Sequence, residues 1–194
     1  MGMDMEAEGG MSKARIAVGA LALSAAALAG WFASEGDGPI KVIDGVEHHV
    51  PYIPVKGDVP TIGHGSTRYE DGTPVKLTDA PIPRYRAQEL AINLHSVEER
   101  RFKASLPGVK LTQGEYDLYV DFVGQFGIGN WRSSSMRRHL LAGEYTQACH
   151  ALLNWKKANG YDCSTLVNGK PNKVCWGVWD RQMTRHAKCM KEQS

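Results

Sequence analysis

Residues 16–33 form an uncharged stretch of eighteen residues that follows two basic side chains, Lys13 and Arg15. Basic residues ahead of an apolar stretch keep the N-terminus in the cytoplasm and direct the chain that follows across the membrane. The length is near the lower limit for a helix that spans a bilayer, and ten of the residues are Ala or Gly. We therefore predict a weak transmembrane helix within residues 13–33, preceded by a disordered cytoplasmic tail over residues 1–12.

A cleavable signal peptide is the alternative interpretation of this stretch. Ala27-Leu28-Ala29 before Gly30 has the pattern of a cleavage site. Cleavage there would leave only five residues ahead of Glu35, so we favour a segment that is not cut. Both interpretations export the rest of the chain.

The composition indicates one ordinary folded domain over residues 34–194. A chain of 194 residues suits one domain with an appendage, and its apolar and charged fractions are typical of globular proteins. The formal net charge of +2 is too small to indicate nucleic acid as a partner. It is compatible with an anionic surface such as the bacterial wall.

The cysteines all lie in the last quarter of the chain, at positions without the close spacing of a zinc site. Two disulfides are favoured in an exported protein, although three pairings are open and four buried free thiols are an alternative. The turn residues from Asn168 to Asn172 would bring the two inner cysteines together. We therefore expect the inner pair, Cys163 with Cys175, nested inside the outer pair, Cys149 with Cys189.

Patterns of apolar residues and turn residues predict the order of the elements. Gly, Pro and β-branched residues predict a hairpin of 40–43 against 46–50 with Asp44-Gly45 as its turn. Thr112-Gln113-Gly114-Glu115 has the form of a capping box that starts a core helix. We expect Arg181, Arg185 and Lys188 on a solvent-facing stripe of the last helix. The expected helices cover residues 83–104, 116–126, 136–142, 145–157 and 178–190.

Glu35 and Asp58 are carboxyl groups in contrasting sequence surroundings. Glu35 follows the apolar stretch, where desolvation favours a protonated carboxyl group, whereas Asp58 lies in a turn rich in Gly and Pro and should stay ionised. Thr61 adds a hydroxyl group, and the missing side chains of Gly63 and Gly65 would let a polymeric ligand approach the backbone. These residues therefore predict an acid and a base beside one cleft.

Glu35-Gly36 after an apolar stretch, followed by residues 59–65 with the sequence Val-Pro-Thr-Ile-Gly-His-Gly, resembles the phage-type lysozymes, the endolysins of glycoside hydrolase family 24. Their active site is a Glu, an Asp and a Thr. Here twenty-five residues separate Glu35 from Thr61, which implies an insertion between them. Asp44 has the usual family spacing from Glu35, but it reads as the tip of the inserted hairpin, so Asp58 is the favoured aspartate.

A second block, residues 125–131 with the sequence Gln-Phe-Gly-Ile-Gly-Asn-Trp, resembles the segment that lines the opposite wall of the cleft in this family. The resemblance implies that Gln125 and Asn130 contact a saccharide and that Trp131 stacks on it, with core packing of Trp131 as the alternative. It also implies substrate contacts from Gly63, His64 and Gly65. Family members usually carry an aromatic residue in place of His64 and a His in place of Ser66.

The fold that this resemblance implies is α+β. It is a two-lobed lysozyme-like fold with a small β-hairpin lobe and a mainly helical C-terminal lobe, preceded by the apolar N-terminal helix. The implied reaction cuts the β-1,4 bond between N-acetylmuramic acid and N-acetylglucosamine in peptidoglycan, without a metal or cofactor. Glu35 would be the acid, and Asp58 with Thr61 would position the attacking water in an inverting geometry.

The implied role is host cell lysis by a monomer that is held in the host inner membrane through residues 13–33. Some phage endolysins carry such a signal-arrest-release segment, which leaves the bilayer and frees the enzyme into the periplasm. Two alternatives remain open. A lytic transglycosylase works with one Glu, and a non-catalytic, membrane-tethered wall-binding protein would result if the insertion displaces Glu35.

Overall fold

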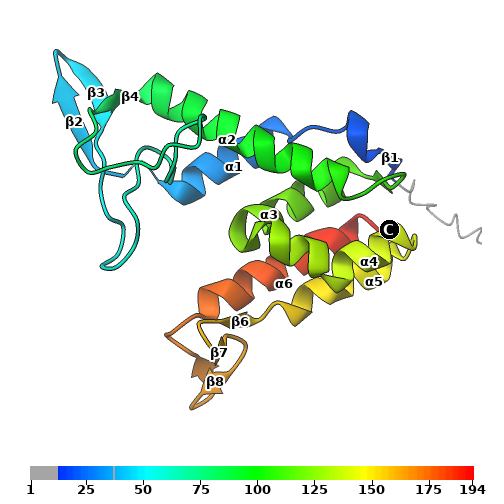
Figure 1. Cartoon of the computed structure of the whole chain (residues 1–194). Helices are drawn as coiled ribbons and strands as arrows, with labels where there is room; N and C mark the ends of the chain where they lie inside the picture. The colour runs from blue at the N-terminus through cyan, green and yellow to red at the C-terminus, as the bar shows by residue number, and fades with distance from the viewer. Residues whose placement is uncertain (1–12, 37) are drawn as a thin grey trace, which may run out of the picture. The chain divides into compact units, whose positions relative to one another are not determined.

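The structure is a computed structural model that describes residues 13–36 and 38–194, without the side chains of residues 32–35. It divides the described chain into two compact units (Figure 1). Unit 1 contains residues 13–23 and 105–194, and unit 2 contains residues 24–104. The boundary after Leu23 falls inside the uncharged stretch 16–33, so that stretch contributes to both units.

Unit 2 begins with helix α1, Ala25–Glu35, whose first turn is capped by Ser24: the Ser24 hydroxyl oxygen accepts from the N–H of Ala27 at 3.1 Å. A three-stranded antiparallel sheet of order β2-β3-β4 follows. Its predicted hairpin is confirmed, because Asp44 and Gly45 both have positive φ, at 50° and 77°, as a tight two-residue turn requires. The strands are β2, Ile40–Ile43; β3, Val46–His49; and β4, Ile82–Pro83.

The long helix of unit 2 is α2, Arg84–Ala104, which agrees with the predicted helix over 83–104. Leu90 of α2 packs in a small core with Ile62 and Val75. The rings of Trp31 on α1 and His95 on α2 meet edge to face, with their centroids 5.0 Å apart. Helix α2 therefore supports both α1 and the loop that contains Ile62.

The N-terminal segment of unit 1 is not the single apolar helix that we predicted over residues 13–33. Strand β1, Ile16–Ala17, pairs with β5, Lys110–Leu111, and the 3-10 turn η1, Val18–Ala20, follows it. Val18 and Leu21 are buried in unit 1, so tertiary burial competes with the weak helical tendency of this Gly-containing stretch. Within the described residues, no helix is both long and apolar enough to cross a membrane.

The core helix of unit 1 is α3, Gln113–Ser133, and its predicted capping box is confirmed. The Thr112 hydroxyl oxygen accepts from the N–H of Glu115 at 3.1 Å, and the Glu115 carboxylate accepts from the N–H of Thr112 at 2.9 Å. Gly127 has φ 82° and kinks the helix. The remaining helices are α4, Ser135–Leu141; α5, Tyr145–Ala151; the 3-10 turn η2, Leu152–Asn154; and α6, Trp176–Lys191.

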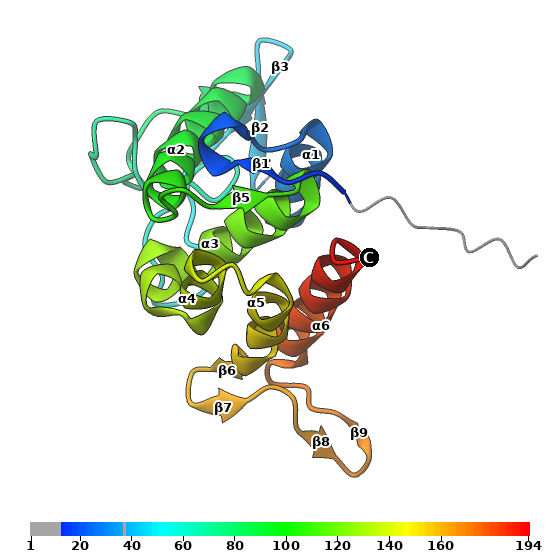
Figure 2. The same cartoon turned by 90° about the vertical axis from the view of Figure 1, so that its right-hand side faces the viewer.

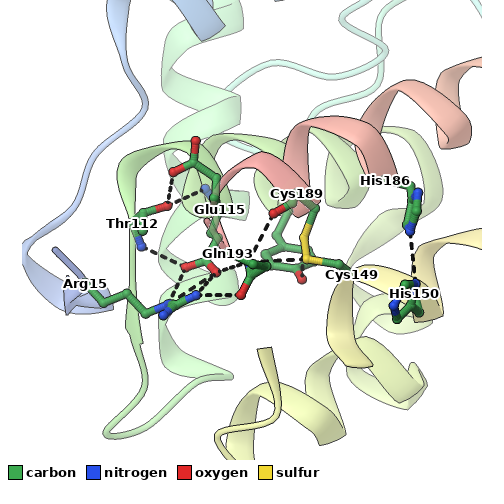
Figure 3. Close-up of a disulfide and its surroundings, with 10 residues drawn as sticks. Arg15, Thr112, Glu115, Cys149, His150, His186, Cys189 and Gln193 are labelled. Atoms are coloured by element: carbon green, nitrogen blue, oxygen red, sulfur yellow. Dashed lines mark hydrogen bonds and ion pairs between the residues drawn. A yellow bond between two sulfur atoms is a disulfide. The ribbon is translucent and has the colours of Figure 1, made fainter. Parts of the chain in front are cut away.

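Both predicted disulfides are confirmed, Cys149–Cys189 with Cα atoms 5.5 Å apart and Cys163–Cys175 with Cα atoms 5.0 Å apart. The first joins α5 to α6, next to a contact between His150 Nδ1 and His186 Nε2 at 3.1 Å (Figure 3). The second closes a loop with two small hairpins (Figure 2). These hairpins pair β6, Lys157–Ala158, with β7, Tyr161–Asp162, and β8, Leu166–Val167, with β9, Lys170–Pro171.

One prediction for the last helix is wrong. Arg185, which we expected on a solvent-facing stripe, is only 3% exposed. Its guanidinium group donates to the carboxylate of Asp121 on α3, with Nε 2.7 Å from Oδ2. The carboxylate lies on a neighbouring helix, so the helical pattern of α6 alone could not reveal the pair.

Candidate active site

The backbone around Thr61 is fixed by two antiparallel bridges. Thr61 and Tyr52 exchange both N–H to carbonyl hydrogen bonds at 2.8 Å, and Ile62 pairs with Ser66. The Thr61 side chain is buried and its hydroxyl group donates to the carbonyl oxygen of Val59 at 3.2 Å. The segment from Tyr52 to Ser66 therefore doubles back on itself, which holds the Thr61 hydroxyl in one place.

Gly63 and Gly65 both have positive φ, at 59° and 79°, a conformation that residues with a Cβ atom rarely adopt. A Cβ atom on Gly63 would lie 2.8 Å from the Cβ of Ala87 on α2. The space beside Gly63 is thus taken by the protein's own helix. This corrects the expectation that its missing side chain makes room for a ligand, whereas Gly65 remains exposed.

His64 connects this segment to the end of α1. Its buried imidazole lies with Nδ1 3.2 Å from the carbonyl oxygen of Gly36. A carbonyl oxygen can only accept, so Nδ1 carries the proton of this hydrogen bond. Gly36 is the residue after Glu35, the last residue of α1. The backbone that carries Glu35 is therefore tied to the segment that carries Thr61, although twenty-five residues separate them in sequence.

Sequence reasoning missed a second histidine in this place. His49, the last residue of β3, is fully buried, and its ring centroid lies 5.5 Å from that of His64. Adjacent histidines on a strand point to opposite faces, and only the burial of one face distinguishes His49 from His48. The hairpin that reads as an insertion thus supplies a packing partner for His64.

The two candidate aspartates lie in different surroundings. Asp58 is exposed in a turn in which its N–H donates to the carbonyl oxygen of Val55 at 2.9 Å, three residues before Thr61. Asp44 is exposed at the tip of the β2–β3 hairpin. It lies four residues after Ile40, which forms the first pair of the hairpin with His49. Four strand residues extend roughly 13 Å, so the tip lies well beyond the base of the hairpin.

The candidate residues of the second block lie in unit 1. The Gln125 Oε1 accepts from Arg185 Nη1 at 2.5 Å, and the exposed Asn130 donates from Nδ2 to the carbonyl oxygen of Phe126 at 2.7 Å. Trp131 is fully buried and donates from Nε1 to the hydroxyl oxygen of Ser105 at 2.8 Å. Trp131 is therefore a core residue, which corrects its interpretation as a stacking surface.

Two neighbouring side chains of unit 2, Tyr69 and Glu70, have strongly shifted pKa values. Hydrogen bonds from Arg86, aided by Asn93, lower the pKa of Glu70 to about 2. Burial, together with the hydrogen bond to Asp79, raises the pKa of Tyr69 to about 12. The hydrogen bonds of Tyr69 and Glu70 stabilise the loop before α2. A carboxylate that stays ionised at low pH cannot serve as a general acid, so Glu70 does not compete with Glu35 for that role.

Among the residues that the structure describes, no group of three or more His, Cys, Asp or Glu side chains could hold a metal ion. The candidate residues in unit 2 are a helix end, a turn carboxylate and a buried hydroxyl group. Two carboxyl residues and a hydroxyl group of this kind are the groups that acid–base chemistry requires.

Comparison with known proteins identifies relatives of this chain. The family model described as phage lysozyme matches residues 41–172. The endolysin of Salmonella phage P22 is 32% identical over 109 residues, which are 56% of this chain and 73% of that protein. The SAR-endolysin of Enterobacteria phage PA-2 is 28% identical over 167 residues, or 84% of this chain and 93% of that protein. The endolysin of Bacillus phage B103 matches over only 22% of its own length.

A solved structure agrees with the sequence relatives. The endolysin from Escherichia coli O157:H7 phage FAHEc1 superimposes with a TM-score of 0.64. The match covers 88% of this chain and 94% of that one at 22% sequence identity. Identity at that level supports the fold alone, which is the lysozyme-like mixed α/β fold expected from the sequence.

Proposed function

This chain belongs to the phage lysozyme family, and from that premise we propose that it hydrolyses the β-1,4 bond between N-acetylmuramic acid and N-acetylglucosamine in bacterial peptidoglycan. The observation that supports this most is the hydrogen bond from His64 to the carbonyl oxygen of Gly36. It draws the end of α1 toward the loop of Thr61, as a shared site for Glu35 and Thr61 requires.

We assign the acid step to Glu35, which would protonate the leaving oxygen of the glycosidic bond. Asp58, in its exposed turn, would orient the water that attacks the other face of the sugar, and Thr61 would hold that water through its hydroxyl group. Inversion of this kind needs two carboxyl groups far enough apart to admit a water molecule. No metal or cofactor takes part in these steps.

Asp58 is preferred to Asp44 because of where each lies along the backbone. The turn of Asp58 runs directly into the bridge between Tyr52 and Thr61. Asp44 lies at the far end of the β2–β3 hairpin. We also propose a substrate contact from the exposed Gly65, and the family resemblance favours contacts from Gln125 and Asn130.

The test compares four single variants by the loss of turbidity of permeabilised Gram-negative cells. Glu35→Gln and Asp58→Asn should each reduce the lysis rate by at least a hundredfold, since general acid–base groups contribute about 10²–10⁴-fold. The matched controls are Glu47→Gln and Asp44→Asn, on the exposed hairpin, which should clear cells at the wild-type rate. Equal clearing by Glu35→Gln and the wild type would remove the catalytic assignment.

Product analysis separates the hydrolase from a lytic transglycosylase. A hydrolase releases ordinary reducing ends, whereas a transglycosylase leaves 1,6-anhydro ends, because it uses one Glu and no attacking water. We expect reducing ends without the anhydro product.

We further propose that residues 13–33 hold the chain in the host inner membrane, with residues 1–12 in the cytoplasm, until this segment leaves the bilayer and residues 34–194 act in the periplasm as a monomer. The name of the PA-2 relative, a SAR-endolysin, favours this proposal. In the folded chain, Val18 and Leu21 are buried in unit 1 and α1 belongs to unit 2. The membrane-bound and folded arrangements of residues 16–33 therefore exclude one another.

A further inference from the structure

Unit 1 carries two small hairpins, β6–β7 and β8–β9 (Figure 2). Several apolar side chains on these hairpins and next to them in sequence are exposed. Tyr161, Leu166, Val167 and Val174 are 57%, 58%, 58% and 65% exposed. Exposed apolar residues on soluble domains are usually scattered singly, whereas these four lie within fourteen residues of the chain. We define the hairpin patch as Tyr161, Leu166, Val167, Lys170, Lys173 and Val174.

The backbone beneath the hairpin patch is firmly held. The Cys163–Cys175 disulfide closes the loop, and the buried Asn172 lies inside it. Its Nδ2 donates to the carbonyl oxygens of Cys163 at 2.9 Å and Thr165 at 3.1 Å, and its Oδ1 accepts from the N–H of Cys175 at 3.0 Å. The exposed side chains of the patch therefore lie on a rigid backbone, which lowers the entropy cost of docking.

At the tip of the β8–β9 hairpin, a basic residue lies opposite an apolar one. Val167 pairs directly with Lys170 across the turn at Asn168 and Gly169, both of which have positive φ. Lys170 and Lys173 are exposed, and no ion pair within the described part of the chain involves either of them.

The acid nearest in sequence to Lys170 is already paired with another lysine. Asp162 is the only acidic residue between positions 156 and 175. Hydrogen bonds from Ser164 and Lys156 lower its pKa to about 2, so it stays paired with Lys156. The patch therefore presents uncompensated positive charge beside apolar side chains.

We propose that the hairpin patch docks on the surface of an anionic phospholipid bilayer. Leucine and valine side chains gain free energy from contact with acyl chains, a tyrosine is favoured at the level of the headgroups, and lysines reach back to anionic phosphates. A polysaccharide would instead need hydrogen-bonding groups, which the four apolar side chains do not supply. One small patch gives reversible attachment, because a stable anchor needs a second signal.

The experiment measures binding of the oxidised full-length protein to phosphatidylglycerol-rich vesicles and to pure phosphatidylcholine vesicles by co-sedimentation. Lysine near an anionic surface contributes about 1 kcal/mol, or about fivefold in affinity. Lys170→Glu with Lys173→Glu should therefore weaken binding to the anionic vesicles by at least about thirtyfold. Leu166→Ser with Val167→Ser should weaken it about tenfold. Wild-type protein should bind phosphatidylcholine far more weakly than phosphatidylglycerol.

The matched control is Lys41→Glu with Lys188→Glu, which changes the net charge equally at exposed positions outside the patch. Charges far from the surface are screened within about a Debye length, so this control should lose less than about threefold. Residues 13–33 are the same in every variant, so any attachment through them does not affect the comparison. Disulfide formation and far-ultraviolet circular dichroism verify that each variant is folded.

Equal vesicle binding by the patch variants and the control would overturn the proposal. So would loss of binding to isolated peptidoglycan sacculi with unchanged vesicle binding, because the occupant would then be the wall. Hydrolysis of isolated peptidoglycan should be the same for all these variants, so a failure here is distinguishable from a failure of the proposed function.

Discussion

At the scale of single residues, His64 links two segments of the candidate active site. Its Nδ1 donates to the carbonyl oxygen of Gly36, and its ring packs near that of His49. Its sequence position offered little guidance, because family members usually carry an aromatic residue there. Only the fold reveals that its partner is the residue after Glu35.

We expect His64→Phe to lower kcat by about tenfold to a hundredfold with little change in KM. A displacement of about 1 Å in a reacting group can cost 10²-fold, and the variant removes the donor that holds Gly36. His64→Asn, whose amide nitrogen can replace Nδ1, should recover most of the activity. Steady-state kinetics on isolated peptidoglycan measures both. Equal kcat values for His64→Phe and the wild type would show that the hydrogen bond has no positioning role.

The helical sequence pattern led to a wrong prediction for Arg185. Its ion pair with Asp121 should make the stability of the fold depend on pH. Burial alone would raise the pKa of Asp121, but Arg185 and Arg181 outweigh it and hold that pKa below its usual value. A carboxyl group with a lowered pKa in the folded state stabilises the fold above its unfolded pKa, about 4. That stabilisation is lost as the pH falls through the lower folded value.

Asp121→Asn should therefore reduce the free energy of unfolding by about 2 kcal/mol near neutral pH. Leaving the buried guanidinium of Arg185 without its carboxylate costs several kcal/mol in a dry site, and the partial exposure of Asp121 reduces the cost. The difference from wild type should shrink as the pH falls below about 4. Urea denaturation across this range measures it, with Asp180→Asn, at an exposed position of α6, as the control. A difference independent of pH would exclude the ion pair as its source.

At the scale of elements, the sequence correctly predicted the turns and helices that depend on residues close together in the chain. The Asp44-Gly45 and Asn168-Gly169 turns, the Thr112 capping box and α2 all follow from neighbouring residues. Elements decided by distant contacts were predicted less well. The expected helix over 145–157 ends at Ala151 and continues only as the turn η2, and β1 exists because Ile16 pairs with Leu111.

Strand β1 also brings the basic flank of the apolar stretch to the start of α3 (Figure 3). Arg15 donates from Nη2 to Oε1 of Glu115 at 2.7 Å and also to Gln193 Oε1, while Glu115 is only 1% exposed. The carboxylate that completes the capping box thus depends on a residue one hundred positions earlier in the chain. In sequence, Arg15 indicated only the orientation of a membrane segment.

Arg15→Met should lower the free energy of unfolding by about 2–4 kcal/mol, because it leaves a buried carboxylate without its cation. Lys13→Met removes a more exposed pair, with Glu192, and should cost less than about 1 kcal/mol. Urea denaturation at neutral pH distinguishes them. Adding Glu115→Gln to Arg15→Met should recover part of the loss, since the unpaired charge is then gone. Equal effects of the Lys13 and Arg15 substitutions would contradict this account of β1.

At the scale of the whole molecule, the use proposed for residues 16–33, as a membrane segment, is incompatible with their use in the fold. Their composition predicts a membrane segment, yet in the fold they form β1, η1 and α1 and are shared between two units. The ten Ala and Gly residues fit both uses, because they make insertion weak and allow a strand, a turn and a helix in one short stretch. Sequence patterns predict the first use, while the second depends on burial of Val18 and Leu21 by residues far along the chain.

Substitutions at Gly19 and Gly30 should shift the equilibrium between the membrane-bound and folded arrangements of residues 16–33. A Cβ atom at either position would meet nothing within 4 Å, so Gly19→Leu with Gly30→Leu should leave the folded units little changed. Each leucine favours insertion by about 0.3–0.6 kcal/mol before the loss of glycine is counted, which predicts a several-fold larger membrane-bound fraction and delayed lysis. Membrane fractionation and lysis timing measure both effects, with Gly19→Ser and Gly30→Ser as the control pair. An unchanged soluble fraction would contradict release from the bilayer as the controlling step.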